Sequence, residues 1–324
     1  MRNLAVLLLA CLAFGSCSSL STEDRDRLAQ FQRTAKAYWE DDRLGQALGQ
    51  IERGLELEPD DYVLNTLKGA ILLKQSPSSQ GIDHRQLDEA TAILARIYEL
   101  RSLRQHQPML LFNYALALQK QARRHAGEVV RLEALAARGV PSIDQGEIAT
   151  NRTASETEFA QAEQLLDTLI DRGELLRLCH YHLLLAAHDR GDSDGITAHS
   201  LAYFKESAKA QVATESDIRR TNQPGFEQQQ KRLLFDLRTE ELEVRSLLAG
   251  YYYDRQEYEV ALTMLDRVLE LDPRRSTDYY NRGRVLLNLG RDADARADFR
   301  KFLATTELPA TSDKAVFAAA QLAR

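Results

Sequence analysis

The sequence from Leu242 to Pro309 matches itself at an offset of 34 residues. Two of the matched places hold small residues and three hold large apolar ones: Ala249 with Gly283, Ala261 with Ala295, Tyr252 with Leu286, Leu265 with Phe299, and Val268 with Phe302. Two antiparallel helices need such an arrangement, because a small residue on each helix lets the two backbones approach closely. A chain that repeats a helix pair at this period buries its apolar surface by stacking successive pairs.

The period and the matched residues resemble the tetratricopeptide repeat (TPR), whose two-helix unit ends in A-x3-F followed by proline. Ala261-x3-Leu265 leads to Pro273, and Ala295-x3-Phe299 leads to Pro309. A third match covers residues 28–61 and places six residues at the same relative positions: Ala35, Tyr38, Ala47, Ile51, Gly54 and Pro59. The resemblance implies an all-α, right-handed TPR-type solenoid of about six helix pairs, with a capping helix over 313–323.

Between these repeats the sequence keeps helical periodicity but loses the 34-residue register. A lengthened turn at 74–86 interrupts the second repeat, and the polar segment 139–155 predicts an exposed loop. Helices are expected over 109–121 with an extension toward Leu135, and over 157–172, 175–188 and 196–210. We expect one helical array over 28–213, a linker over 214–230, and a C-terminal repeat pair with its cap over 231–324.

The N-terminus has the pattern of a processing signal. Arg2 precedes an apolar core of eleven residues from Leu4 to Phe14, which favours a secretory signal peptide over a membrane span. Gly15-Ser16-Cys17 resembles the lipobox of bacterial lipoproteins, in which the cysteine is lipidated and becomes the mature N-terminus. Cys11 is the alternative processing site, and cleavage into a plain secreted protein is the alternative fate. The resemblance implies a signal peptide over 1–16, a lipidated tether over 17–27, and an outer-membrane anchor with the chain facing the periplasm.

The composition argues against several functional classes. The net charge is −6 and no basic face stands out, so we set nucleic-acid binding aside. Lipidation of Cys17 would leave Cys179 without a disulfide partner within the chain. The sequence contains no glycine-rich phosphate loop and no H-E-x-x-H motif, so we expect neither a cofactor nor a metal.

Two short clusters contain residue types that catalytic or metal sites use. Gly191 to Gly195 satisfies G-x-S-x-G, but that motif requires a strand before the serine, where helix is expected here. Cys179, His180, His182 and His188 crowd one expected helix, but no second cluster supplies further metal ligands. We interpret the first cluster as a turn between helices and the second as core packing. An enzyme built around His180, His182 and Ser193 is the alternative.

In TPR proteins the first helix of each pair lines a concave groove that takes peptides. The repeat register places nine side chains of this sequence in the groove: Gln32, Lys36, Trp39, Ser246, Tyr253, Asp254, Tyr280, Arg284 and Asn288. Exposed Trp, Tyr and Arg are the residue types that anchor interfaces. Arg284 and Asn288 resemble the basic residue and asparagine with which some TPR domains hold a peptide carboxylate.

These features predict a non-enzymatic scaffold of the cell envelope that binds a protein partner. The resemblance implies a role in outer-membrane assembly, in recruiting peptidoglycan enzymes, or in secretion or pilus machinery. A periplasmic small-molecule-binding or transport-accessory protein is the alternative.

Overall fold

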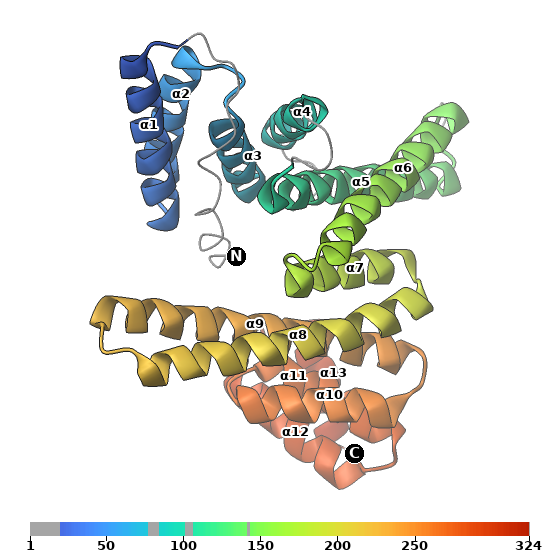
Figure 1. Ribbon diagram of the computed structural model, residues 1–324. Helices are drawn as coiled ribbons and strands as arrows, with labels where there is room; N and C mark the ends of the chain where they lie inside the picture. Colours follow the sequence, from blue (N-terminus) through green and yellow to red (C-terminus); the bar gives the residue numbers. More distant parts are fainter. Residues whose placement is uncertain (1–19, 77–83, 101–105, 141–142, 324) are drawn as a thin grey trace. The chain divides into compact units, whose positions relative to one another are not determined.

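The computed structural model describes residues 20–76, 84–100, 106–140 and 143–323 (Figure 1). The chain divides into two compact units, Met1–Glu206 and Ser207–Arg324, and each is described by itself. The lipidation site predicted at Cys17, its alternative Cys11 and most of the predicted turn at 74–86 lie outside the described residues. Over the residues described, no helix is both long and apolar enough to cross a membrane.

The described residues form thirteen helices and no strand, which confirms the predicted all-α array of helix pairs. In chain order the helices are α1 (Thr22–Glu40), α2 (Leu44–Leu57), α3 (Tyr62–Gln75), α4 (Arg85–Glu99), α5 (Pro108–Ala137), α6 (Gln145–Asp171), α7 (Leu176–Arg190), α8 (Ser193–Arg220), α9 (Pro224–Asp254), α10 (Tyr258–Leu271), α11 (Ser276–Asn288), α12 (Asp292–Thr305) and α13 (Asp313–Leu322). They correspond to six successive pairs followed by one single helix at the predicted capping position. The right-handed twist of the array stays a prediction.

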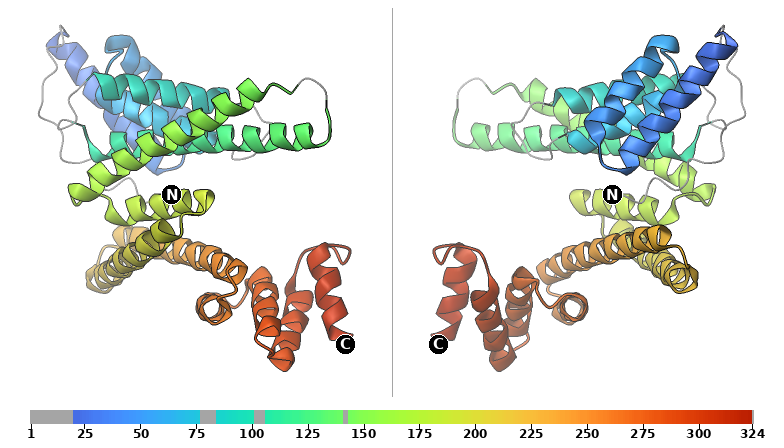
Figure 2. Two further views of the ribbon diagram at one scale, coloured as in Figure 1. Left: turned by 90° about the vertical axis from the view of Figure 1, so that its right-hand side faces the viewer. Right: turned by 90° about the vertical axis from the view of Figure 1, so that its left-hand side faces the viewer.

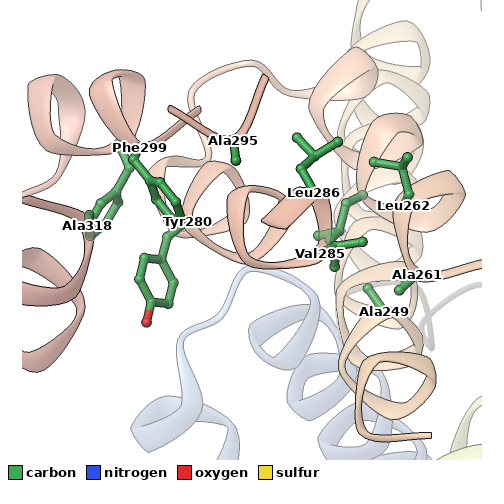
Figure 3. Packing of buried hydrophobic residues seen from close by; sticks show 11 residues of the cluster. Ala249, Ala261, Leu262, Tyr280, Val285, Leu286, Ala295, Phe299 and Ala318 are labelled. Atoms are coloured by element: carbon green, nitrogen blue, oxygen red, sulfur yellow. The ribbon is translucent and has the colours of Figure 1, made fainter. Parts of the chain in front are cut away.

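The small residues of the 34-residue register lie where helices come closest. A Cβ atom added at Gly283 of α11 would lie 2.7 Å from the Phe299 ring of α12, which is closer than real Cβ atoms approach. Phe299 is itself fully buried, as are Ala295 and Phe302. Figure 3 shows Phe299 among its neighbours Tyr280 and Ala318. Glycine at this position therefore allows the two helices of the last pair to pack against one aromatic side chain.

A second feature of the register sets the turn within each repeat. Asp42, Gln256 and Gly290 each lie seven residues after the small residue of their repeat, and their φ angles are 62°, 63° and 72°. A left-handed residue at this place reverses the chain between the two helices of a pair. The same backbone turn therefore closes α1–α2, α9–α10 and α11–α12.

Helix α6 corrects the prediction of an exposed loop over 139–155. Residues 145–155 belong to this helix of 27 residues, which begins where the Asp144 carboxylate accepts a hydrogen bond from the Gly146 amide. Its first turns are held by Ile148, which is buried with Val129 and Leu132 of α5. Helices α5 and α6 lie side by side and extend well beyond the length of a repeat helix (Figure 2).

The segment 214–230, which we predicted as a linker, is helical except at residues 221–223. Its first part ends α8 and its second part begins α9, and Pro224 occupies the first turn of α9. The two units divide within α8, between Glu206 and Ser207, so this segment lies inside the second unit. Proline is tolerated in the first turn of a helix, and the Asn-Gln-Pro-Gly sequence therefore interrupts the helices only briefly.

Candidate functional site

Three of the predicted groove residues meet on the face shared by α9 and α11. The hydroxyl oxygen of Tyr253 accepts hydrogen bonds from Arg284 Nη2 at 3.0 Å and from Asn288 Nδ2 at 3.1 Å. The Arg284 guanidinium also lies over the Tyr253 ring, 4.5 Å from its centroid. Arg284 and Asn288 are one helical turn apart and so project from the same side of α11. The cluster holds the arginine side chain in one orientation.

A small cavity of about 120 Å³ opens beside this cluster. Its lining comes from α9, α10 and α11: Ala249, Gly250, Tyr253, Asp254, Leu265, Asn281, Arg284 and Val285. A Cβ atom added at Gly250 would meet no atom within 4 Å, so the space above this glycine is open. The repeat register explains the opening, because Gly250 takes the place in α9 that Arg284 takes in α11.

The charges at this cavity are not neutralised by neighbouring side chains. Arg284 forms no ion pair with any residue that the structure describes. Asp254, an exposed residue that lines the same cavity, likewise has no ion-pair partner in the described part of the chain. The guanidinium uses only part of its donor set on Tyr253, since arginine carries five N–H groups. The site can therefore bind a carboxylate at Arg284 and a cation at Asp254.

Ser246 and Tyr280 occupy the same repeat position in α9 and α11, but neither lines this cavity. The Ser246 hydroxyl donates to Asp278 Oδ1 at 3.1 Å, and Asp278 also accepts a 2.6 Å bond from Arg275 Nε. Tyr280 is 7% exposed and packs against Phe299, Phe302 and Phe317. The expectation that Tyr280 projects into an open groove is therefore wrong, because α13 supplies Phe317 and covers it.

The three predicted groove residues of the first unit have separate local contacts. Gln32 Nε2 donates to Asp61 Oδ2 at 2.8 Å, which joins α1 to the N-cap of α3. Lys36 lies 3.6 Å from Glu40 one turn along α1. Trp39 packs on the α1–α3 core, and the Lys74 ammonium lies 5.4 Å from its ring centroid. A role of these three residues in partner binding stays a prediction.

Asn281 and Gly250 line the cavity but were not predicted from the sequence. Asn281 lies three residues before Arg284, and Gly250 lies three before Tyr253, so both follow from helical spacing once the face is known. The sequence-based prediction considered large side chains, whereas a glycine contributes to the site through the space that it leaves open.

The cysteine and histidine cluster of α7 is mostly core. Cys179 is fully buried, and burial raises the pKa of its thiol to about 12, so the sulfur stays protonated. The Nδ1 atom of His182 is buried, and burial lowers the pKa of this imidazole to about 3. No three His, Cys, Asp or Glu side chains converge as metal ligands over the residues described. Ser193 begins α8, after a turn rather than a strand.

Comparison with known proteins identifies one repeat. Residues 279–305, which span most of α11 and α12, match the tetratricopeptide repeat family model. No curated protein matches the chain. Two solved structures align over most of its length. The TPR domain of P58(IPK) is 14% identical, with a TM-score of 0.24, and the alignment covers 93% of this chain and 90% of that one. Yeast Tom70 is 12% identical, with a TM-score of 0.25, and the alignment covers 92% of this chain and 96% of that one. The chain thus carries a tetratricopeptide repeat at 279–305.

Proposed function

We propose that this chain is a non-enzymatic scaffold that binds a segment of a partner protein on the α9–α11 face. The observation that supports this most directly is the Arg284 guanidinium, which Tyr253 orients and which no carboxylate neutralises in the described part of the chain. Arginine presents N–H groups in a planar fork that matches a carboxylate. An acidic side chain or a chain terminus of the partner is the group that Arg284 would hold.

The size of the cavity favours a peptide over a free small molecule. Its volume of about 120 Å³ is well below the roughly 300–1,000 Å³ of pockets that enclose a drug-sized ligand. A second cavity on this unit, of about 280 Å³, is lined among others by Arg282, Asp266 and Asp298, whose charges already pair with one another. A single side chain fits the smaller cavity, and the Asn281 and Asn288 amides can pair with peptide groups around it.

Residues 1–17 support a cell-envelope location for this scaffold. The apolar core from Leu4 to Phe14 and Cys17 fit an outer-membrane lipoprotein that faces the periplasm. The lipid would set the location, and the groove would raise the local concentration of a partner. Partners of this kind act in outer-membrane assembly, in peptidoglycan processing, or in secretion and pilus machinery.

A steric block tests the binding face without disturbing the fold. Gly250→Phe places a ring in open space above the cavity, and Arg284→Gln removes the charge. The matched controls are Gly49→Phe, at a helical glycine with equally open surroundings in α2, and Arg300→Gln, at an exposed arginine on α12. Crosslinking in intact cells followed by purification should lose one specific partner in both test variants and keep it in both controls. A partner list that is the same in all five samples would contradict the proposed face.

A separate experiment tests the location. Cys17→Ala should abolish lipid labelling and release the protein from the membrane fraction, whereas Cys11→Ala should change neither. Retention of lipid in Cys17→Ala would move the processing site or remove the anchor from the proposal.

A further inference from the structure

Two histidines from neighbouring helices of the first unit face each other. His180 lies on α7 and His199 on α8, and their Nδ1 atoms are 3.3 Å apart. The ring centroids are 5.5 Å apart and the ring planes differ by 34°, so the two nitrogens lie between the rings. Both side chains are half-buried, which leaves the pair accessible to solvent ions.

The separation of the two nitrogens equals the spacing of two ligands on one tetrahedral metal ion. Zinc binds imidazole nitrogen at about 2.0–2.1 Å, so two such ligands at a tetrahedral angle lie roughly 3.3–3.4 Å apart. Neutral imidazole binds metals through either ring nitrogen, provided that the proton is on the other one. Burial lowers the pKa of both imidazoles, which favours their neutral forms. The two Nδ1 atoms share a hydrogen bond, and a metal ion would replace it with the proton of each ring on Nε2.

The surroundings of the pair are acidic. Asp167 and Glu163 of α6 act electrostatically on His199, as does Asp192, which precedes α8. Glu206 of α8 acts in the same direction on His180. Arg190 is the cation that opposes them at His199. Glu163 and Arg190 form an ion pair, and the carboxylates of Asp167, Asp192 and Glu206 add negative charge that attracts a divalent cation.

We propose that His180 and His199 form a two-imidazole site for a borderline divalent transition ion, of which Zn²⁺ is the probe. The protein supplies two nitrogen ligands, and water completes the coordination, since the described residues bring no third ligand into the group. Imidazole selects Zn²⁺, Cu²⁺ and Ni²⁺ over Mg²⁺ and Ca²⁺, which prefer oxygen. The bound ion ties α7 to α8, because one ligand comes from each helix.

Isothermal titration of the untagged full chain with Zn²⁺ near neutral pH tests the site. The wild type should bind one ion at this site, and His180→Gln and His199→Gln should each weaken binding by about tenfold or more. His188→Gln is the matched control, since this histidine is on the same helix, with its side chain 41% exposed. Mg²⁺ should give no saturable signal at the same concentrations.

A second measurement keeps the test independent of how well a variant folds. Circular dichroism establishes that each variant keeps its helices. Zinc affinity unchanged in both His180→Gln and His199→Gln would overturn the proposal, as would an equal loss in His188→Gln or the absence of saturable binding by the wild type.

Discussion

The last repeat pair, α11–α12, and the long pair, α5–α6, bury polar groups in different ways. In the repeat, Arg282 donates to both carboxylate oxygens of Asp298, at 2.7 and 2.8 Å, and to Asp266 at 2.8 Å. In α5, Gln119 and Gln121 are 1% and 5% exposed, and the Oε1 atom of each lacks a hydrogen-bond partner in the described structure. The repeat pairs opposite charges, whereas the long helix buries neutral amides.

This difference follows from the helix length at which each pair is closed. A left-handed residue ends the first helix of a repeat at a fixed place, and small residues then bring its partner into close contact. Helices α5 and α6 also end in left-handed residues, Gly139 and Gly173, but only after 30 and 27 residues. Longer helices cover more surface with the same repertoire of side chains, so polar groups such as Gln119 enter the interface. The regular helix length of a repeat thus gives its polar side chains defined partners. In the longer helices some buried polar atoms have no hydrogen-bond partner in the described structure.

The largest effect is expected from truncating the aromatic core of the repeat. Phe299 is fully buried against Gly283 and Tyr280, and Phe299→Ala should cost about 3–5 kcal/mol of unfolding free energy. Phe235→Ala, at a phenylalanine of the same unit that is 66% exposed, should change stability by no more than about 0.5 kcal/mol. Urea unfolding followed by circular dichroism measures both. Similar losses in the two variants would show that the repeat core is not packed as described.

The second prediction concerns the buried charges of the repeat. Asp298→Asn should lower the free energy of unfolding by about 3 kcal/mol, because Arg282 keeps its bond to Asp266 but loses its bidentate carboxylate partner. The double variant Arg282→Met, Asp298→Leu should recover most of this loss, since it removes both charges from a largely buried place. Thermal unfolding of Arg282→Met, Asp298→Leu and the double variant closes the cycle. A double variant as unstable as the sum of its two single variants would mean that Arg282 and Asp298 do not interact energetically, which would contradict this prediction.

Much of this comparison could be predicted from the sequence, and the reasons are local. The 34-residue match places Gly283 against Phe299 and gives Tyr253, Arg284 and Asn288 a common face, because both consequences need only helical spacing. The burial of Tyr280 could not be predicted in this way. Ser246, which takes the same position one repeat earlier, is half-exposed. In the last repeat the side chain of Tyr280 is covered because Phe317 of α13 packs against it.

The first turns of α6 could not be predicted from the sequence for a different reason. Residues 145–155 include Gly146, Asn151 and two threonines, which favour turns or caps over helix interiors. Tertiary contact outweighs these preferences, because Ile148 is buried against α5 and the Ser155 hydroxyl donates to the Ala122 carbonyl at 2.9 Å. Such contacts between the long helices have no periodic signature, so a single sequence does not reveal them.

The third prediction tests the neutral buried groups of the first unit by pH. Burial holds the pKa of His182 at about 3, with Arg123 and Arg177 adding repulsion, whereas an unfolded histidine titrates near 6.5. The folded chain binds fewer protons between these values, so stability is complete above about pH 6.5 and falls as the pH drops toward 3. Two units below 6.5 the loss should reach about 2.7 kcal/mol. His182→Leu should remove this part of the dependence, as measured by urea unfolding in metal-free buffer with Trp39 fluorescence. A wild type and variant with parallel pH profiles would contradict the assignment.

The smallest effect is expected at the turn that defines the repeat. Gln256 and Gly290 take the same left-handed position, with φ angles of 63° and 72°, in successive repeats. Gln256→Gly should stabilise the chain by about 1 kcal/mol, because a left-handed conformation costs a residue with a Cβ atom roughly 1–2 kcal/mol and glycine loses part of that gain through unfolded-state entropy. Gly290→Gln should destabilise it by a similar amount, and no neighbouring atom lies within 4 Å to add a steric term. Thermal unfolding of the two variants should therefore give shifts of opposite sign. Shifts of the same sign would mean that the two repeats do not close through equivalent turns.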